Sequence, residues 1–198
     1  MLLIGLGSKA KNGKDTVAQA FKEALGNSVR LYSFANELKT YCKDHHAELL
    51  LDWQVANGTE EVPVSKEDPI YGYSAILQYY GTDIVRAKDP NHWVKALEHR
   101  IEVEQPEIAV ITDVRFLNEA TWIKENGGTL IDVIRRKKDG TRWLDPNRDP
   151  NHISETALDE YLGWDYVLLA GDGEIEKLKS KALGVLHNVI RERASGLA

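Results

Sequence analysis

The sequence predicts an α/β fold in which a five-stranded parallel sheet carries helices on both faces. Short apolar clusters rich in β-branched residues recur at residues 2–6, 30–34, 108–112, 129–134 and 166–170. Such bounded runs are typical of strands that are buried on both faces. Stretches with helical spacing of apolar residues lie between the clusters, and this alternation favours parallel pairing through right-handed crossovers. The 198 residues are enough for one domain with a substantial core.

Apolar spacing predicts helices near residues 17–25, 90–101, 119–125 and 175–190. Gly26 provides a stop for the first of them, and the Asp89-Pro90 pair is typical of the start of the second. Two stretches exceed a simple crossover: residues 36–105, which include a polar segment at 57–68, and residues 135–153, which are basic and then turn-rich. Loops this long are often binding loops or lids.

The composition excludes several classes of protein. A net charge of −6 argues against binding to polymeric nucleic acid. Cys42 is the only cysteine, so no internal disulfide can form and a reducing compartment such as the cytoplasm is expected. No apolar run approaches the roughly 20 residues of a membrane helix, and the N-terminus lacks the basic region of a signal peptide.

A phosphate-binding loop is expected directly after the first strand. Residues 8–15 read S-K-A-K-N-G-K-D, and the P-loop pattern is G-x-x-x-x-G-K-[ST]. Gly13 and Lys14 fit, whereas Ser8 replaces the first glycine and Asp15 replaces the magnesium-binding hydroxyl, with Thr16 just behind it. Backbone N–H groups and a helix N-terminus still form an anion nest there. The expected ATP contacts in this loop are Ala10, Lys11, Asn12, Gly13, Lys14, Asp15 and Thr16.

Further motifs follow in a characteristic order. They are S-F-A-x-x-L-K at 33–39, G-T-x-x-x-R-x-x-D-P-x-x-W at 81–93, T-D-V-R-F-x-N-E-A at 112–120 and H-x-S-E-x-x-L-D at 152–159. With the G-K-D-T variant of the P-loop, this set resembles the phage-type deoxynucleoside monophosphate kinases, which are P-loop kinases related to adenylate and guanylate kinases. Ser8 and Leu117 depart from the family pattern. The first departure is expected to loosen the phosphate nest.

The resemblance implies that the γ-phosphoryl group of ATP is transferred to a deoxynucleoside monophosphate with the help of Mg²⁺. It also implies one P-loop kinase domain over residues 1–198, with a monophosphate-binding insertion at 36–105 and a mobile lid at 135–153. A phage-encoded enzyme of this kind would act in the host cytoplasm, and a homodimer is the default oligomeric state.

Phosphoryl transfer depends on positioning and charge neutralisation, so cations and a metal-binding acid are the expected catalytic groups. Lys14 is expected on the transferred group. Asp113 lies at the carboxyl end of a predicted strand, where ligands bind in such sheets, and Arg115 follows it. Asp113 and Asp15 are the expected Mg²⁺ ligands, directly or through water, and Arg115 is expected to hold a phosphate. Asn118 and Glu119 are expected to cap the next helix instead.

The residues expected to bind the acceptor monophosphate are implied by the resemblance. It makes Arg86 a clamp on the monophosphate and makes Phe34, Lys39 and Trp93 candidates for the acceptor pocket, although Trp93 also fits the apolar stripe of its own helix. Lys11 could face the acceptor phosphate or solvent.

The sequence does not assign a single role to each residue of the expected lid. Arg135 and Arg136 are expected near ATP, with stacking on adenine as one role. The other lid candidates are Arg142, Arg148, His152 and Glu155. One lid arginine is expected to act as an arginine finger. His152 and Glu155 could instead cap the helix that follows.

Two other functions remain open from the sequence. One is a P-loop kinase for another small metabolite, such as a dephospho-coenzyme A kinase. The other is a nucleotide-binding module without catalysis, which the Ser8 and Asp15 departures would allow.

Overall fold

The computed structural model describes residues 1–64, 68, 70–146 and 149–196. Two compact units make up the chain: residues 1–33 together with 99–198, and residues 34–98. Within the described ranges, no helix combines the length and the apolar character needed to cross a membrane.

The first unit is built on a five-stranded parallel sheet, as the sequence predicts. Its strands are β1 (Leu2–Gly7), β2 (Val29–Tyr32), β3 (Ile108–Val114), β4 (Thr129–Arg136) and β5 (Tyr166–Gly171). They lie in the order β2-β3-β1-β4-β5, and every neighbouring pair is parallel. The central strand β1 therefore precedes the phosphate loop, and its neighbour β3 contains Asp113.

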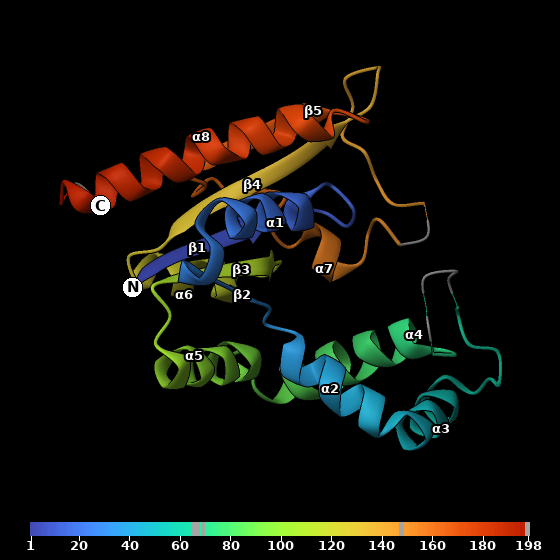
Figure 1. The fold of residues 1–198 in the computed structure, drawn as a ribbon. Coiled ribbons are helices and arrows are strands. Elements are labelled where there is room, and N and C mark those ends of the chain that lie inside the picture. The colour runs from blue at the N-terminus through green and yellow to red at the C-terminus, as the bar shows by residue number, and fades with distance from the viewer. Residues whose placement is uncertain (65–67, 69, 147–148, 197–198) are drawn as a thin grey trace. The chain divides into compact units, whose positions relative to one another are not determined.

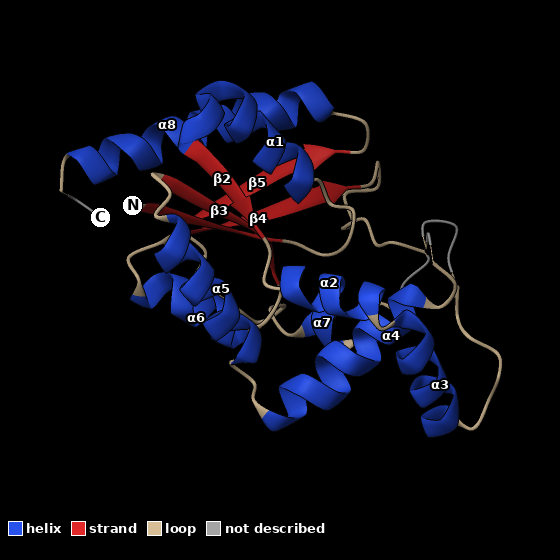
Figure 2. Ribbon diagram, turned by 60° about the horizontal axis from the view of Figure 1, so that its bottom comes forward, coloured by secondary structure: helices blue, strands red, loops and turns tan. Residues whose placement is uncertain are grey.

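Helices cover both faces of this sheet (Figures 1 and 2). On one face lie α1 (Lys14–Leu25) and α8 (Ile175–Ala194), and on the other lies α6 (Leu117–Glu125). Successive side chains of a strand point to opposite faces. Ile4 and Leu6 of β1 accordingly pack into the core with α1 and α8, whereas Gly5 lies against Ile123 of α6. Two short helices, η1 (Gly26–Ser28) and α7 (Ile153–Thr156), lie in connections.

The second unit is helical and occupies most of the long insertion. It contains α2 (Asn36–Asp44), α3 (His46–Asn57), α4 (Tyr73–Gln78), the π-helix η2 (Tyr79–Arg86) and the first part of α5 (His92–Glu104). The wide turn of η2 carries the G-T-x-x-x-R motif, and the indole Nε1 of Trp93 donates to the carbonyl of Gly81 at 3.2 Å. π-helical turns are rare and occur often at functional sites.

The start of α5 differs from the prediction. The Asp89-Pro90 pair does not start α5, which begins at His92. The Asp89 carboxylate accepts from the backbone N–H of Asn91 at 3.0 Å, and this bond closes a turn before the helix. The pair therefore acts as a turn rather than as the cap itself.

Candidate active site

The phosphate loop joins β1 to α1 at the carboxyl edge of the sheet. Two of its residues have left-handed backbone conformations, Lys11 with φ 54° and Gly13 with φ 104°. Glycine adopts this conformation without the penalty that a Cβ brings, which explains why Gly13 stands directly before the helix. Lys14 is the first residue of α1. The helix N-terminus therefore adds its partial positive charge to the side chain of Lys14.

Side chains of the loop itself hold it to the neighbouring strand. Ser8 Oγ donates to the carbonyl of Val133 in β4 at 2.6 Å. Asn12 is 1% exposed. Its Nδ2 donates to the carbonyls of Ala10 and Trp143, and its Oδ1 accepts from the N–H of Arg135. The serine in place of the first P-loop glycine thus ties the loop to β4, which does not support the loosening expected from the sequence.

The charged groups of the loop differ in their surroundings. Lys14 is largely buried, with its Nζ 3.6 Å from the carboxylate of Asp15, whose side chain is 82% exposed. Lys11 lies with its Nζ 3.5 Å from the buried carboxylate of Asp145. Thr16 is half-buried in the first turn of α1. Lys14 is therefore shielded from solvent, as is Lys9, whereas Asp15 faces solvent.

Asp113 is the last residue but one of β3, because this strand continues to Val114 rather than ending at residue 112. The pairing of β3 with β1 shifts by one residue here: Gly5 pairs with Ile111, but Gly7 pairs with Val114. A bulge of this kind re-aims the side chains that follow it. The hydroxyl of Ser33 donates to Asp113 Oδ2 at 2.5 Å. A neighbour from the end of β2 therefore orients the carboxylate.

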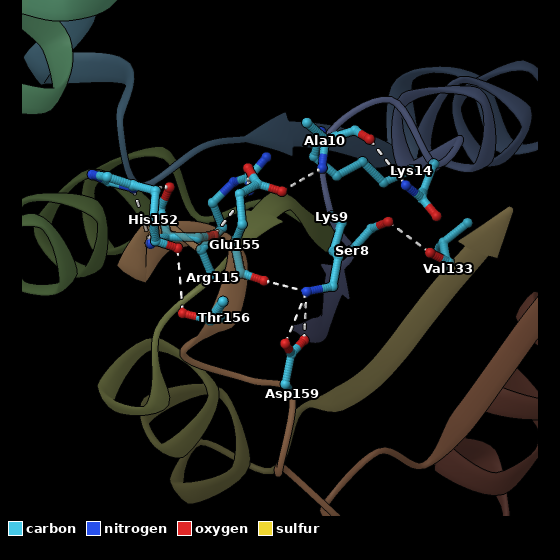
Figure 3. A network of polar contacts seen from close by, with 12 residues as sticks. Ser8, Lys9, Ala10, Lys14, Arg115, Val133, His152, Glu155, Thr156 and Asp159 are labelled. Atoms are coloured by element: carbon cyan, nitrogen blue, oxygen red, sulfur yellow. Dashed lines mark hydrogen bonds and ion pairs between the residues drawn. The ribbon is translucent and has the colours of Figure 1, made fainter. Parts of the chain in front are cut away.

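Arg115 reaches the phosphate loop through one carboxylate, that of Glu155 (Figure 3). Arg115 Nη1 donates to Glu155 Oε1 at 2.6 Å, and the backbone N–H of Ala10 donates to Glu155 Oε2 at 2.9 Å. Glu155 belongs to α7, where His152 is the cap: the Nδ1 of His152 accepts from the N–H of Ser154. The structure therefore assigns capping to His152 and a bridging contact to Glu155.

Glu119 has the structural role that the sequence predicts. Its buried carboxylate accepts from the backbone N–H groups of Arg115 at 2.8 Å and Phe116 at 3.1 Å, next to the start of α6. Negative charge at a helix N-terminus is favourable. This contact also holds the backbone of Arg115.

Two arginines at the start of the expected lid contact neighbouring residues. Arg135 pairs with Asp172, and its guanidinium carbon lies 4.4 Å from the ring centroid of Trp143. Arg136 Nη1 donates to the carbonyl of Gly140 at 2.6 Å. Arg148 lies outside the described residues. Trp143 is thus a second candidate for the stacking expected near ATP.

Arg142 forms an ion pair with the buried Asp132 that sequence reasoning missed. Its Nη2 lies 3.1 Å from Asp132 Oδ1 in β4, and Asp132 is 7% exposed. Burial raises the pKa of Asp132, and Arg142 opposes this rise. Among the described residues the buried Nε of Arg142 has no hydrogen-bond partner, and a cavity of about 30 Å³ adjoins the pair, enough for about one water molecule. The sequence did contain one signal for this pair: Asp132 is the single acidic residue in the mainly apolar run T-L-I-D-V-I, where a buried acid needs a partner.

The acceptor candidates belong to the second unit. Phe34 and Trp93 are 2% and 4% exposed, Lys39 is exposed, and Arg86 is half-buried at the end of η2. The burial of Trp93 and its bond to Gly81 favour the packing role that the sequence left open. The binding roles of all four stay predictions.

Magnesium fits the oxygen donors at this end of the sheet. Among the described residues no group of three or more His, Cys, Asp or Glu side chains is arranged as a cation cage. Mg²⁺ in phosphoryl-transfer enzymes is usually held by one or two carboxylates together with substrate phosphates and water. An oriented Asp113 and an exposed Asp15 at the start of α1 match that donor set.

Comparisons with known proteins identify the family of this chain. A family model described as deoxynucleotide monophosphate kinase matches residues 41–182. The putative deoxynucleotide monophosphate kinase of Acanthamoeba polyphaga mimivirus is 33% identical over 204 residues, which cover 95% of this chain and 97% of the relative. The deoxynucleoside-5'-monophosphate kinase of Escherichia phage T5 is 32% identical over 83 residues, 39% of this chain and 33% of that protein.

Among solved structures, dephospho-CoA kinase from Campylobacter jejuni aligns with a TM-score of 0.51 at 14% identity, over 99% of this chain and 98% of that one. This likeness supports the P-loop kinase fold alone. The family model and the relative aligned over nearly the whole length go further, and by them the chain belongs to the deoxynucleotide monophosphate kinase family.

Proposed function

We propose that this protein transfers the γ-phosphoryl group of ATP to the phosphate of a deoxynucleoside 5'-monophosphate. The observation that carries the proposal lies within the first unit. A phosphate loop with a shielded Lys14 is linked through Glu155 to Arg115, which follows strand β3. Two phosphate-bearing substrates require cations on both sides of the transferred group. Membership of the family supports a nucleotide acceptor.

The residues of the first unit have separate roles in binding the substrates and in neutralising charge. The nest of residues 10–16 binds the phosphates of ATP, and Lys14 neutralises charge on the transferred group. Arg115 holds a phosphate oxygen of the acceptor. Asp113 and Asp15 would hold Mg²⁺, which would supply neutralisation of the negative charge on the phosphates of ATP. No protein nucleophile is required, because catalysis here rests on positioning and electrostatics.

The second unit and the basic loop supply the remaining groups. Arg86 and Lys39 bind the acceptor monophosphate, and Phe34 and Trp93 shape its pocket. Residues 135–153 act as the lid, with Arg135 and Arg136 near ATP and one of Arg135, Arg136, Arg142 or Arg148 stabilising the transition state. The single-domain organisation, the homodimer and the host cytoplasm as location stay predictions alongside these roles.

A coupled assay of ADP release tests the proposal. The purified protein is given ATP, Mg²⁺ and a panel of acceptors: the deoxynucleoside and ribonucleoside monophosphates and dephospho-coenzyme A. We expect turnover that depends on at least one deoxynucleoside monophosphate. ATP binding without acceptor-dependent turnover would indicate a non-catalytic module, and turnover with dephospho-coenzyme A alone would indicate the other kinase class.

Lys14→Ala tests the proposed mechanism. The variant loses the cation nearest the transferred group, so we expect kcat to fall by about 10²- to 10³-fold. Lys177→Ala is a matched control, because Lys177 is an exposed lysine of α8 that pairs with Glu174. Its kcat should equal that of the parent protein. A near-normal rate for Lys14→Ala would remove this lysine from the mechanism.

A further inference from the structure

Glu155 joins two parts of the proposed active site that the sequence leaves unconnected. Its side chain is 6% exposed, and each carboxylate oxygen has a different partner. Oε1 accepts from the guanidinium of Arg115 at 2.6 Å, and Oε2 accepts from the backbone N–H of Ala10 at 2.9 Å (Figure 3). One carboxylate therefore sets the position of Arg115 relative to the phosphate loop.

The backbone around Glu155 is held by other bonds. We call residues 152–159 the strap. Lys9 Nζ donates to the carbonyl of Glu155 at 2.7 Å and pairs with Asp159 at 2.7 Å. Arg115 Nη1 also donates to the carbonyl of Ser154 at 3.0 Å. These contacts involve no atom of the Glu155 side chain, so the strap keeps anchors when that side chain is changed.

The chemistry of the site calls for a carboxylate. Glutamate accepts hydrogen bonds on both oxygens, whereas glutamine has the same shape but only one accepting oxygen. The Glu155 charge also offsets the guanidinium of Arg115, whose side chain is only 14% exposed. A buried charge is costly unless it is paired and hydrogen-bonded. The Glu155 carboxylate therefore accepts a hydrogen bond from Arg115 and one from Ala10, and no neutral side chain of this size can do both and also balance the charge of Arg115.

We propose that Glu155 is a positioning residue that aims Arg115 at the acceptor phosphate and sets its distance from the ATP loop. Both bonds of Arg115 to the strap leave from Nη1. A guanidinium carries five N–H donors, so Nε and Nη2 can meet a phosphate while Nη1 stays with Glu155. This inference rests on the proposed function, because it assigns Glu155 to the geometry of that reaction.

Glu155→Gln is the decisive variant. It keeps the side-chain volume and one acceptor, but it breaks either the Arg115 bond or the Ala10 bond. A misplacement of about 1 Å at a reacting group costs about 10²-fold in rate, so we expect a fall of that size in kcat. Glu160→Gln is the matched control: it is the same acid-to-amide change on an exposed residue five positions along the chain, and it should leave kcat unchanged.

A double-mutant cycle separates positioning from a merely structural role. If Glu155 acts through Arg115, then Arg115→Ala combined with Glu155→Gln should be no slower than Arg115→Ala alone. Losses that multiply, or a Glu155→Gln variant with parental kcat, would overturn the inference. A loss that only follows the fraction of folded protein in thermal unfolding would overturn it as well.

Two further arms keep the result decisive. Should Glu155→Gln fail to fold, Glu155→Asp enters the same cycle, since it keeps both oxygens and the charge but is one methylene too short to reach both partners. The parent protein is assayed first with the acceptor panel. Absence of turnover there would reject the proposed function, whereas turnover in the parent with parental kcat in the variant would reject only the role of Glu155.

Discussion

Replacing Asn12 with alanine should destabilise the first unit through the phosphate loop. Asn12 is 1% exposed, and its amide makes three hydrogen bonds, to Ala10 O at 2.9 Å, Trp143 O at 3.1 Å and Arg135 N at 3.0 Å. A protein hydrogen bond contributes about 1 kcal/mol net, so the loss should be about 3 kcal/mol. For a chain of this length that corresponds to a fall of about 6–12 °C in Tm.

Equilibrium unfolding in urea, followed by circular dichroism, measures the free energy of unfolding, and titration calorimetry measures the affinity for ATP. ATP should bind more weakly to the variant, because the nest must then be ordered at the moment of binding. Asn126→Ala is the control, since Asn126 is exposed and its amide donates one bond, to Trp122 O at 2.9 Å. A change below about 1 kcal/mol for Asn12→Ala, the value of a single bond, would refute the reasoning.

Two more predictions concern the second unit and the buried ion pair. Gly81→Ala would place a Cβ 2.3 Å from Leu38 Cδ2, so we expect a loss of about 1–3 kcal/mol in urea unfolding, and an unchanged midpoint would show that Leu38 moves aside at no cost. The pKa of Asp132 is raised by burial, so its stabilising contribution is complete below about pH 3.9, the value for unfolded chains, and is lost as pH rises through the folded-state pKa. As pH rises from about 4, the free energy of unfolding of the parent protein should therefore fall relative to that of Asp132→Asn. Parallel pH profiles of the two proteins in urea titrations would contradict this.

Residues whose role is set by local pattern were predicted well. The five strands follow from apolar runs, and the phosphate loop follows from its position between the first run and an amphipathic helix. Glu119 was expected to cap and charge the N-terminus of the next helix, and its carboxylate does accept from the backbone there. Such features depend on neighbours within a few residues, which a sequence displays directly.

Of the helices of the insertion, only α5 was predicted individually. The apolar residues of α3 do not gather on one face: Leu51 and Val55 are exposed, while Leu49 is buried. The π-helical turn of η2 departs from the 3.6-residue period that identifies an α-helix. Both elements depend on packing within the second unit, such as Leu38 against Gly81.

The sequence by itself determined the sheet and the family of this protein, and it located the loop where phosphate binding is expected, because these depend on periodicity and on motifs of fixed spacing. Only the tertiary structure decided which side chains meet. Glu155 contacts Ala10 across 145 positions, and Asp132 pairs with Arg142 beside a cavity that Arg115 and Glu155 also line. In a parallel sheet, residues distant in sequence converge where the strands end, and the partners of a buried charge are chosen by that convergence rather than by spacing along the chain.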